Sequence, residues 1–400
     1  MYGSISAVGP ANPERLREID LLRGLVIVLM TLDHVRDYFH SDALTFDPLN
    51  PDRTTPILYL TRWATHLCAP TFVLLAGVSG SLQLRMGKSK SALSWLLFTR
   101  GLWLVVLELT VLSFAQSFGF PYPLLLLVIW AIGWSMIALA ALVWLPPTAV
   151  LIVGITIIAG HNLLDPIAPA QLGDAALLWT LFHEGGPLFV NDALIGVVGY
   201  PVLPWVGVIA LGYGMGAIFA APSERRDPIL MSLGLAMFAA FLVLRSVNQY
   251  GDPRHWASNA DFAHSAMSFF DVTKYPPSFL FTLLTLGLVF ALFPLLSRLK
   301  GRTASVLAVL GAVPFFYYVV HIFAAHALSI AANTALGRDA SGLVEYMQNV
   351  FTAPDRLQGL GFSLPYVYLA WITVLLLLYP LCRWWAQVKA QRHAWWHSYL

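Results

Sequence analysis

The most constraining feature of this sequence is a series of long apolar runs that follow one another along almost the whole chain. An α-helix needs about 20 mostly apolar residues to cross the ~30 Å hydrocarbon core of a bilayer. The runs that approach or exceed this length lie near residues 21–40, 57–84, 91–117, 122–145, 147–162, 202–221, 229–247, 276–297, 304–334 and 365–385. We therefore expect an all-α, polytopic membrane protein with about ten transmembrane helices, forming a single domain over residues 1–400.

Composition supports this class. Of the 400 residues, 58% are apolar and only 11% are charged, whereas a soluble domain carries about 25% charged residues. This excludes an ordinary cytosolic protein, a disordered chain and a nucleic-acid binder. The two cysteines, Cys68 and Cys382, lie within or at the end of apolar runs, so we interpret them as packing residues rather than a disulfide pair.

Two segments need separate interpretation. Residues 175–200 are apolar but are interrupted by Gly185, Gly186 and Pro187, which favours a re-entrant or interfacial segment over an eleventh span. The first 20 residues are polar, and the first apolar run continues into a full-length span. We therefore expect no cleavable signal peptide.

The distribution of positive charge predicts the topology, because Lys and Arg are retained on the cytoplasmic side. With the N-terminus inside, thirteen Lys and Arg residues fall in inner segments and five in outer loops. Both termini are then cytoplasmic: residues 1–20 form an N-terminal segment and residues 386–400 an interfacial tail that mixes Trp with basic residues. The long connections, all outside, are residues 41–56, 163–201, 248–275 and 335–364.

The first span carries an unusual set of ionisable residues, each of which is costly at membrane depth. His34 follows Arg23 by eleven residues, or roughly 16 Å along a helix, which is about halfway across the core. Asp37 is one turn beyond His34, where it could hold the imidazole tautomer. Asp33 and Arg36 are spaced to pair with each other. An acid–base role and a purely structural role are both open for this set.

Other candidates lie in or beside later spans. Arg62 and His66 are four residues apart and share a helix face, and Arg100 stands near the inner end of the third span. Glu108, at the centre of that span, is either neutral or paired with an arginine of a neighbouring helix. The ninth span carries His321 and His326. The outer-loop residues that could line an acceptor site are His183, Glu184, Asn248, Tyr250 and Asp252.

A metal or haem centre is not expected. His321 and His326 are five residues apart, which is poor spacing for two ligands on one helix, and the chain has no HExxH or CxxC motif. Nothing in the sequence favours His34 and His321 as axial haem ligands.

Several stretches resemble the heparan-α-glucosaminide N-acetyltransferase catalytic-domain family in its bacterial branch. They are LREIDLLRGLVIVLMTLDHVRDYF, TRWATHLCAPTFVLLAGVSG, LTRGLWLVVLELT, VIWAIGWSMIALA, YPVLPWVGVIALGYGMG, KYPPSFLFTLLTLG and GAVPFFYYVVHIFAAHAL. They are spread over nearly the whole chain. Arg23 and His34 also match the Arg-x10-His pattern in the first helix of the wider transmembrane acyltransferase group.

The resemblance implies an enzyme that takes an acyl group from cytosolic acyl-CoA and delivers it to an amine or hydroxyl, often of a sugar, across the membrane. By position, Arg23 would hold the CoA phosphates and His34 would be the catalytic base. The lysosomal member has an Asn-Tyr-Gly-Gly-like stretch where this chain continues from His34 to Asp37, and its histidine comes later. The nearest counterpart here is His66 and the next is His40, so the two mappings disagree.

Our leading hypothesis is an acyl-CoA-dependent acyltransferase of the bacterial cytoplasmic (inner) membrane, with acetyl-CoA as the expected donor and a sugar-like or envelope molecule as acceptor. The candidate catalytic residues are His34, Asp37 and His66. The candidate CoA-binding residues are Arg23, Arg62 and Arg100, and His321 joins the outer-loop residues as a candidate substrate contact. Beyond these ligands and the lipid bilayer, no nucleic-acid partner is expected, and homo-oligomerisation stays open. The alternatives are a transporter or flippase, and a non-catalytic membrane protein.

Overall fold

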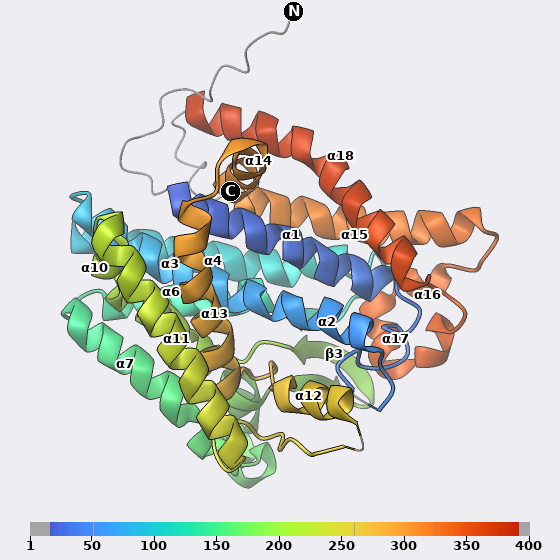
Figure 1. The fold of residues 1–400 in the computed structure, drawn as a ribbon. Helices are drawn as coiled ribbons and strands as arrows, with labels where there is room; N and C mark the ends of the chain where they lie inside the picture. Colours follow the sequence, from blue (N-terminus) through green and yellow to red (C-terminus); the bar gives the residue numbers. More distant parts are fainter. Residues whose placement is uncertain (1–16, 51, 260, 392–400) are drawn as a thin grey trace, which may run out of the picture.

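The computed structural model describes residues 17–50, 52–259 and 261–391, and within them the chain is almost entirely helical (Figure 1). The long helices are α1 (Arg17–Phe39), α3 (Cys68–Arg85), α4 (Lys90–Leu107), α6 (Val128–Leu142), α7 (Pro147–Gly160), α9 (Val202–Gly214), α11 (Ser223–Val247), α13 (Phe279–Ser297), α14 (Gly301–Ala312), α15 (Pro314–Ala335) and α18 (Leu364–Gln391). The shorter ones are α2 (Pro56–Ala64), η1 (Thr65–Leu67), η2 (Glu108–Leu112), α5 (Ser113–Ala115), η3 (His161–Leu164), η4 (Pro169–Ala175), α8 (Ala176–Trp179), η5 (Thr180–Glu184), α10 (Gly216–Phe219), α12 (Phe262–Phe270), α16 (Ser341–Val344), α17 (Tyr346–Thr352) and η6 (Pro354–Leu357).

Seven helical stretches of the described chain are long and apolar enough to cross a membrane. They are Pro56–Arg85, Lys90–Ala115, Pro147–Leu164, Ser223–Val247, Phe279–Ser297, Pro314–Ala335 and Leu364–Gln391. The helices α6, α9 and α14 are apolar but shorter, and α1 has the length of a span but carries several charges. The protein is therefore an integral membrane protein, while the expected number of about ten spans stays a prediction.

Local sequence explains where these helices begin and end. The side chains of Thr55, Ser89 and Ser278 each accept a hydrogen bond from a backbone N–H in the first turn of α2, α4 and α13. The expected single span over residues 304–334 is wrong, because the structure divides it into α14 and α15. The division falls at Val313, which has a non-helical ψ of 48°, immediately before Pro314. The residue before a proline is sterically restricted, and proline itself suits the first turn of a new helix.

Helix α1 lies in the interior of the bundle, between α14, α15, α18 and α3. It approaches α14 most closely at two glycines. A Cβ atom on Gly311 would lie 1.9 Å from the backbone oxygen of Asp20, and one on Gly24 would lie 2.0 Å from that of Leu307. Small residues allow helix backbones to approach in this way within a membrane. The contact fixes the position of the first turns of α1, which carry Arg23.

The expectation of a purely helical chain needs a correction, because the structure also contains a small sheet. Strand β3 (Ala193–Val198) pairs in parallel with β1 (Leu124–Leu126) and antiparallel with β2 (Gly186–Val190). Asn191 and Asp192 both have positive φ, as a tight hairpin turn with this strand twist requires. The segment 175–200 is thus not a span, as expected, but its second half is a β-hairpin.

The molecule has two distinct ends. The first turn of α1 and the last turn of α18 lie at one end (Figure 1), where Arg23, Gln83 and Lys389 line one cavity; we call this the basic end. The helix α18 continues through residues 386–391, the first part of the expected interfacial tail. Residues 1–16 and 392–400, which hold the rest of the two expected terminal segments, lie outside the described residues.

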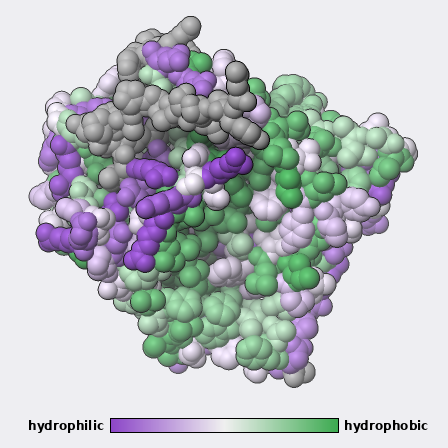
Figure 2. All heavy atoms as spheres, turned by 45° about the horizontal axis from the view of Figure 1, so that its top comes forward, coloured by the Kyte–Doolittle hydropathy of each residue, from purple (hydrophilic) through white to green (hydrophobic). Residues whose placement is uncertain are grey.

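The long connections gather at the opposite end, which we call the loop end. His40 pairs with Phe362 in an isolated bridge, and the hydroxyl of Tyr59 donates to the carbonyl of Met267 over 2.8 Å. Between the ends, much of the surface is apolar, and hydrophilic residues gather toward the left of the view in Figure 2. Strand β3 also contacts α17, so all four long connections meet on one side, as alternation of the loops predicts. The assignment of that side to the exterior stays a prediction.

Candidate functional site

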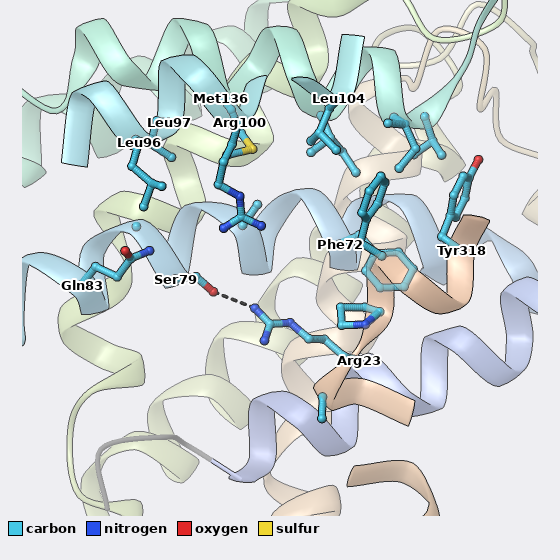
Figure 3. A pocket seen from close by; sticks show the side chains of 18 of the residues that line it. Arg23, Phe72, Ser79, Gln83, Leu96, Leu97, Arg100, Leu104, Met136 and Tyr318 are labelled. Atoms are coloured by element: carbon cyan, nitrogen blue, oxygen red, sulfur yellow. Dashed lines mark hydrogen bonds between the residues drawn. The ribbon is translucent and has the colours of Figure 1, made fainter. Parts of the chain in front are cut away.

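A cavity of about 380 Å³ opens between α1, α3, α4 and α6 at the basic end. Its polar part is lined by Arg23, Arg100 and Lys389 together with Ser79 and Gln83. Arg23 and Arg100 extend into the space from opposite walls (Figure 3), and Nη2 of Arg23 donates to Oγ of Ser79 over 2.7 Å. Arg23 and Arg100, both CoA-binding candidates from the sequence, thus share one cavity.

Away from these cations the cavity wall is apolar. It is formed by side chains such as Phe72, Leu97, Leu104 and Met136, and it extends to Tyr318 on α15. Figure 3 shows Tyr318 at the side of the cavity away from Gln83 and Arg23. The cavity therefore has one cationic part and one apolar part, and it joins the basic end to the interior of the bundle.

Two histidines meet beside Tyr318. The ring of Tyr318 lies edge-on to His34, with centroids 6.0 Å apart, and edge-on to His321 at 5.5 Å. Nδ1 of His34 is 2.7 Å from Nε2 of His321. His34 comes from the middle of α1 and His321 from α15. The structure thus brings together two predicted residues that are far apart in the sequence, next to the inner end of the cavity.

The hydrogen bonds of this pair select the tautomers of the neutral rings. Nδ1 of His321 is 3.0 Å from the backbone oxygen of Tyr317, and a carbonyl only accepts, so this nitrogen carries the proton. Nε2 of His321 is then an acceptor, and Nδ1 of His34 donates to it. This leaves Nε2 of His34 as the nitrogen with a free lone pair. The tautomer follows from the hydrogen-bond network.

Asp37 does not hold His34 in this structure, contrary to our expectation. Its Oδ1 is in close contact with Nη2 of Arg36, and Nδ1 of His34 instead contacts Nε2 of His321. The predicted pair of Asp33 and Arg36 is present, with 2.9 Å between Oδ1 and Nη2. Nη2 of Arg36 therefore contacts both carboxylates.

Arg62 does not line the cavity, so the structure does not bring it together with Arg23. Its Nη1 donates to Oδ1 of Asp33 over 3.0 Å, and its Nη2 to the hydroxyl of Tyr275 over 3.5 Å. Nζ of Lys274 also lies near this carboxylate, 3.7 Å from Oδ2 of Asp33. Lys274 is one of the five basic residues that the sequence places in outer loops, and nothing in the sequence predicts that it lies beside α1.

The two alternative histidines have different surroundings. His66 is 1% exposed, and neither ring nitrogen has a hydrogen-bond partner among the described residues. His40, just after α1, accepts a hydrogen bond at Nδ1 from the backbone N–H of Asp42. Burial lowers the pKa of His40, which keeps its ring neutral at neutral pH. Neither lines the cavity described above.

Glu108 has no arginine partner in the described structure. It is fully buried at the start of the π-helical segment η2, and its Oε2 accepts from the backbone N–H of Trp130 over 2.9 Å. Trp130 lies in the first turn of α6, where backbone N–H groups lack partners and attract an acidic group. This carboxyl therefore serves as a helix cap rather than as an ion-pair partner.

The outer-loop candidates His183 and Tyr250 make contacts that hold their own loops in place. His183 is buried, with Nε2 3.1 Å from Oδ1 of Asp165, whereas Glu184 is exposed. The hydroxyl of Tyr250 donates to the carbonyl of Ala159. These contacts are structural, and they do not bring the three residues together with the histidine pair.

Asn248 and Asp252 organise the loop that follows α11. Asn248 ends this helix in the left-handed conformation and exchanges two hydrogen bonds with the backbone of Trp256. Asp252 accepts from the backbone N–H and hydroxyl of Thr273 and from the hydroxyl of Ser278. The carboxylate therefore holds the segment between Thr273 and Ser278, which carries Lys274 against α1.

The described residues contain no group of three or more His, Cys, Asp or Glu side chains arranged to hold a metal ion. The two cysteines are both buried and free. Sγ of Cys68 donates to the backbone oxygen of Val26 over 3.3 Å. It is not among the residues that line the cavity.

Comparison with known protein families finds a match over the first part of the chain. The family model described as heparan-alpha-glucosaminide N-acetyltransferase, catalytic, matches residues 15–251, which is more than half of the chain. The chain belongs to this family. No curated protein matches the chain. The matched range includes Arg23, His34 and Arg100, whereas Lys274 and His321 lie beyond it.

Proposed function

We propose that this protein is a membrane acetyltransferase of the bacterial cytoplasmic membrane that takes an acetyl group from cytosolic acetyl-CoA. The acceptor is an amine or hydroxyl group of a sugar-like molecule, which approaches from the loop end. One observation carries the proposal. A single cavity runs from the cations at the basic end to Tyr318, which contacts both His34 and His321.

The cationic part of the cavity suits the nucleotide half of the donor. Guanidinium groups bind phosphate oxygens through paired N–H donors, and a lysine adds a point charge. Arg23, Arg100 and Lys389 supply these groups at the basic end, which the distribution of positive charge assigns to the cytoplasm. The cavity volume lies in the usual range for ligand pockets, and the apolar wall toward Tyr318 suits the uncharged pantetheine arm and its thioester.

The histidine pair supplies the base. Nε2 of His34 has the free lone pair, so it accepts the proton of the acceptor as the nucleophilic nitrogen or oxygen attacks the thioester carbonyl. The carbon–sulfur bond then breaks, the acetyl group stays on the acceptor, and the CoA thiolate leaves and takes up the proton from His34. Direct transfer is favoured over an acyl-Cys68 intermediate, because Cys68 does not line the cavity and its thiol donates a hydrogen bond to the backbone oxygen of Val26.

The test is acetyl-CoA binding and turnover by the purified full chain in detergent, with the His34→Ala and Arg23→Gln variants. We expect acetyl-CoA to stabilise the wild type and to be slowly hydrolysed when no acceptor is present. His34→Ala should lose about 10²–10⁴-fold in turnover while it still binds acetyl-CoA. Arg23→Gln should weaken binding by about tenfold, as the loss of one charge-assisted hydrogen bond of ~1.5 kcal/mol does.

Two results would contradict the proposal. Unchanged turnover in His34→Ala would remove this histidine as the base. If the wild type neither binds nor hydrolyses acetyl-CoA, the enzyme hypothesis is wrong and the transporter hypothesis is favoured.

A further inference from the structure

A group of buried charged residues lies next to His34, and none of them lines the cavity at the basic end, which we call the donor cavity. We call this group the Asp33 cluster; it consists of Asp33, Arg36, Asp37, Arg62 and Lys274. Oδ1 of Asp33 is 3.0 Å from Nη1 of Arg62 and 2.9 Å from Nη2 of Arg36, and its Oδ2 is 3.7 Å from Nζ of Lys274. Three cations therefore face two carboxylates, which leaves one unit of positive charge.

The excess of positive charge is accompanied by hydrogen-bond donors of Arg36 that have no partner among the described residues. Arg36 is 1% exposed, and its Nη2 serves both Asp33 and Asp37. Its Nε and Nη1 are buried without a hydrogen-bond partner among the described residues. Leaving charged donors buried and unpaired costs more free energy than a typical hydrogen bond returns. Arg36 therefore retains two donors that an anionic group would satisfy.

The cluster is accessible from one side. The side chain of Asp37 is 37% exposed and Tyr275, whose hydroxyl accepts from Arg62, is 47% exposed, whereas the three cations are nearly buried. Arg36 and Asp37 follow His34 toward the loop end of α1, and Lys274 is held there by the loop that Asp252 organises. The accessible side thus lies toward the loop end, opposite to Arg23.

We propose that the Asp33 cluster binds a phosphate or carboxylate group of the acceptor. This inference rests on the proposed function, because it places the acceptor's nucleophile at Nε2 of His34 while its anion is held by Arg36, Arg62 and Lys274. Guanidinium groups recognise both anions through paired hydrogen bonds. The acceptor class is therefore an acidic, sugar-like molecule, either soluble or carried on a membrane lipid through a phosphate.

Binding of matched probes to the full chain in detergent tests this site and separates its two sources. Glucosamine 6-phosphate is compared with glucosamine as the soluble pair, and citronellyl phosphate with citronellol as the lipid-like pair. We expect the phosphorylated member of at least one pair to bind about tenfold tighter than its neutral partner. The pair that shows this preference identifies the source. Equal affinity within both pairs, or no binding of either phosphate, would overturn the proposal.

Variants test whether the preference for the phosphorylated probe arises from the Asp33 cluster. Lys274→Gln should abolish most of it, Lys274→Arg should retain it, and Lys300→Gln, an exposed lysine at the basic end, serves as the matched control for general charge. Asp37→Asn changes a half-exposed group and should tighten phosphate binding, because it removes a competing carboxylate from Arg36. A preference that survives Lys274→Gln, or a weaker affinity in Asp37→Asn, would contradict the assignment.

Acetyl-CoA binding is measured on the same samples. Phosphate selectivity without acetyl-CoA binding would contradict the proposed function but leave the anion site standing. Acetyl-CoA turnover without phosphate selectivity would remove the anion site alone.

Discussion

At the scale of single residues, the position of one proton determines what His34 is able to do. A neutral imidazole presents a lone pair at only one nitrogen. The backbone oxygen of Tyr317 orients His321, and His321 in turn engages Nδ1 of His34. This carbonyl–His–His chain takes the place that we expected Asp37 to occupy. His321 is therefore a positioning residue in our account, since it acts through His34.

Replacement of His321 tests this role. His321→Ala removes one buried hydrogen bond of about 1–3 kcal/mol and should lower kcat by about 10- to 100-fold, with little change in KM for acetyl-CoA. His321→Gln keeps an acceptor oxygen near the position of Nε2 and should recover part of the loss. Steady-state kinetics of both variants measure this split. An equal loss in the two variants, or a change confined to KM, would indicate that His321 only fills space.

At the scale of elements, the donor cavity depends on how closely α14 approaches α1. The contact is made at Gly24 and Gly311. Arg23 and Ala312, next to these glycines in the sequence, both line the cavity. Because the two backbones are in contact, any added side chain must separate the helices or distort them. The packing of α14 against α1 therefore affects the position of Arg23 in the cavity.

Gly311→Ala should disturb both properties. Overpacking of this kind costs about 1–3 kcal/mol, so we expect a lower Tm and weaker acetyl-CoA binding in the same variant. Gly160→Ala is the matched control, because a Cβ atom there meets nothing within 4 Å. Thermal unfolding with and without acetyl-CoA measures both effects. A wild-type Tm for Gly311→Ala would show that the helices do not pack as described.

At the scale of the whole molecule, the sequence predicts the features that depend on the length of apolar runs and on the spacing of residues along one helix. The apolar runs predict most of the helices, and the spacing of Arg23 and His34 along one helix predicts a cation at one end and an imidazole inside. The hairpin after Gly186 and the division before Pro314 were missed, because an apolar run of this length does not reveal where the backbone leaves the helix. Lys274 and Tyr318 were missed because they reach His34 only through tertiary packing.

In our proposal, one cavity brings the donor from the basic end to His34. The most direct measurement is an experimental structure of the full chain with a non-hydrolysable acetyl-CoA analogue. We expect the phosphate groups to lie beside Arg23, Arg100 and Lys389, and the acyl carbon to lie about 3–4 Å from Nε2 of His34. An analogue bound elsewhere, or one whose acyl group points away from the histidine pair, would contradict it.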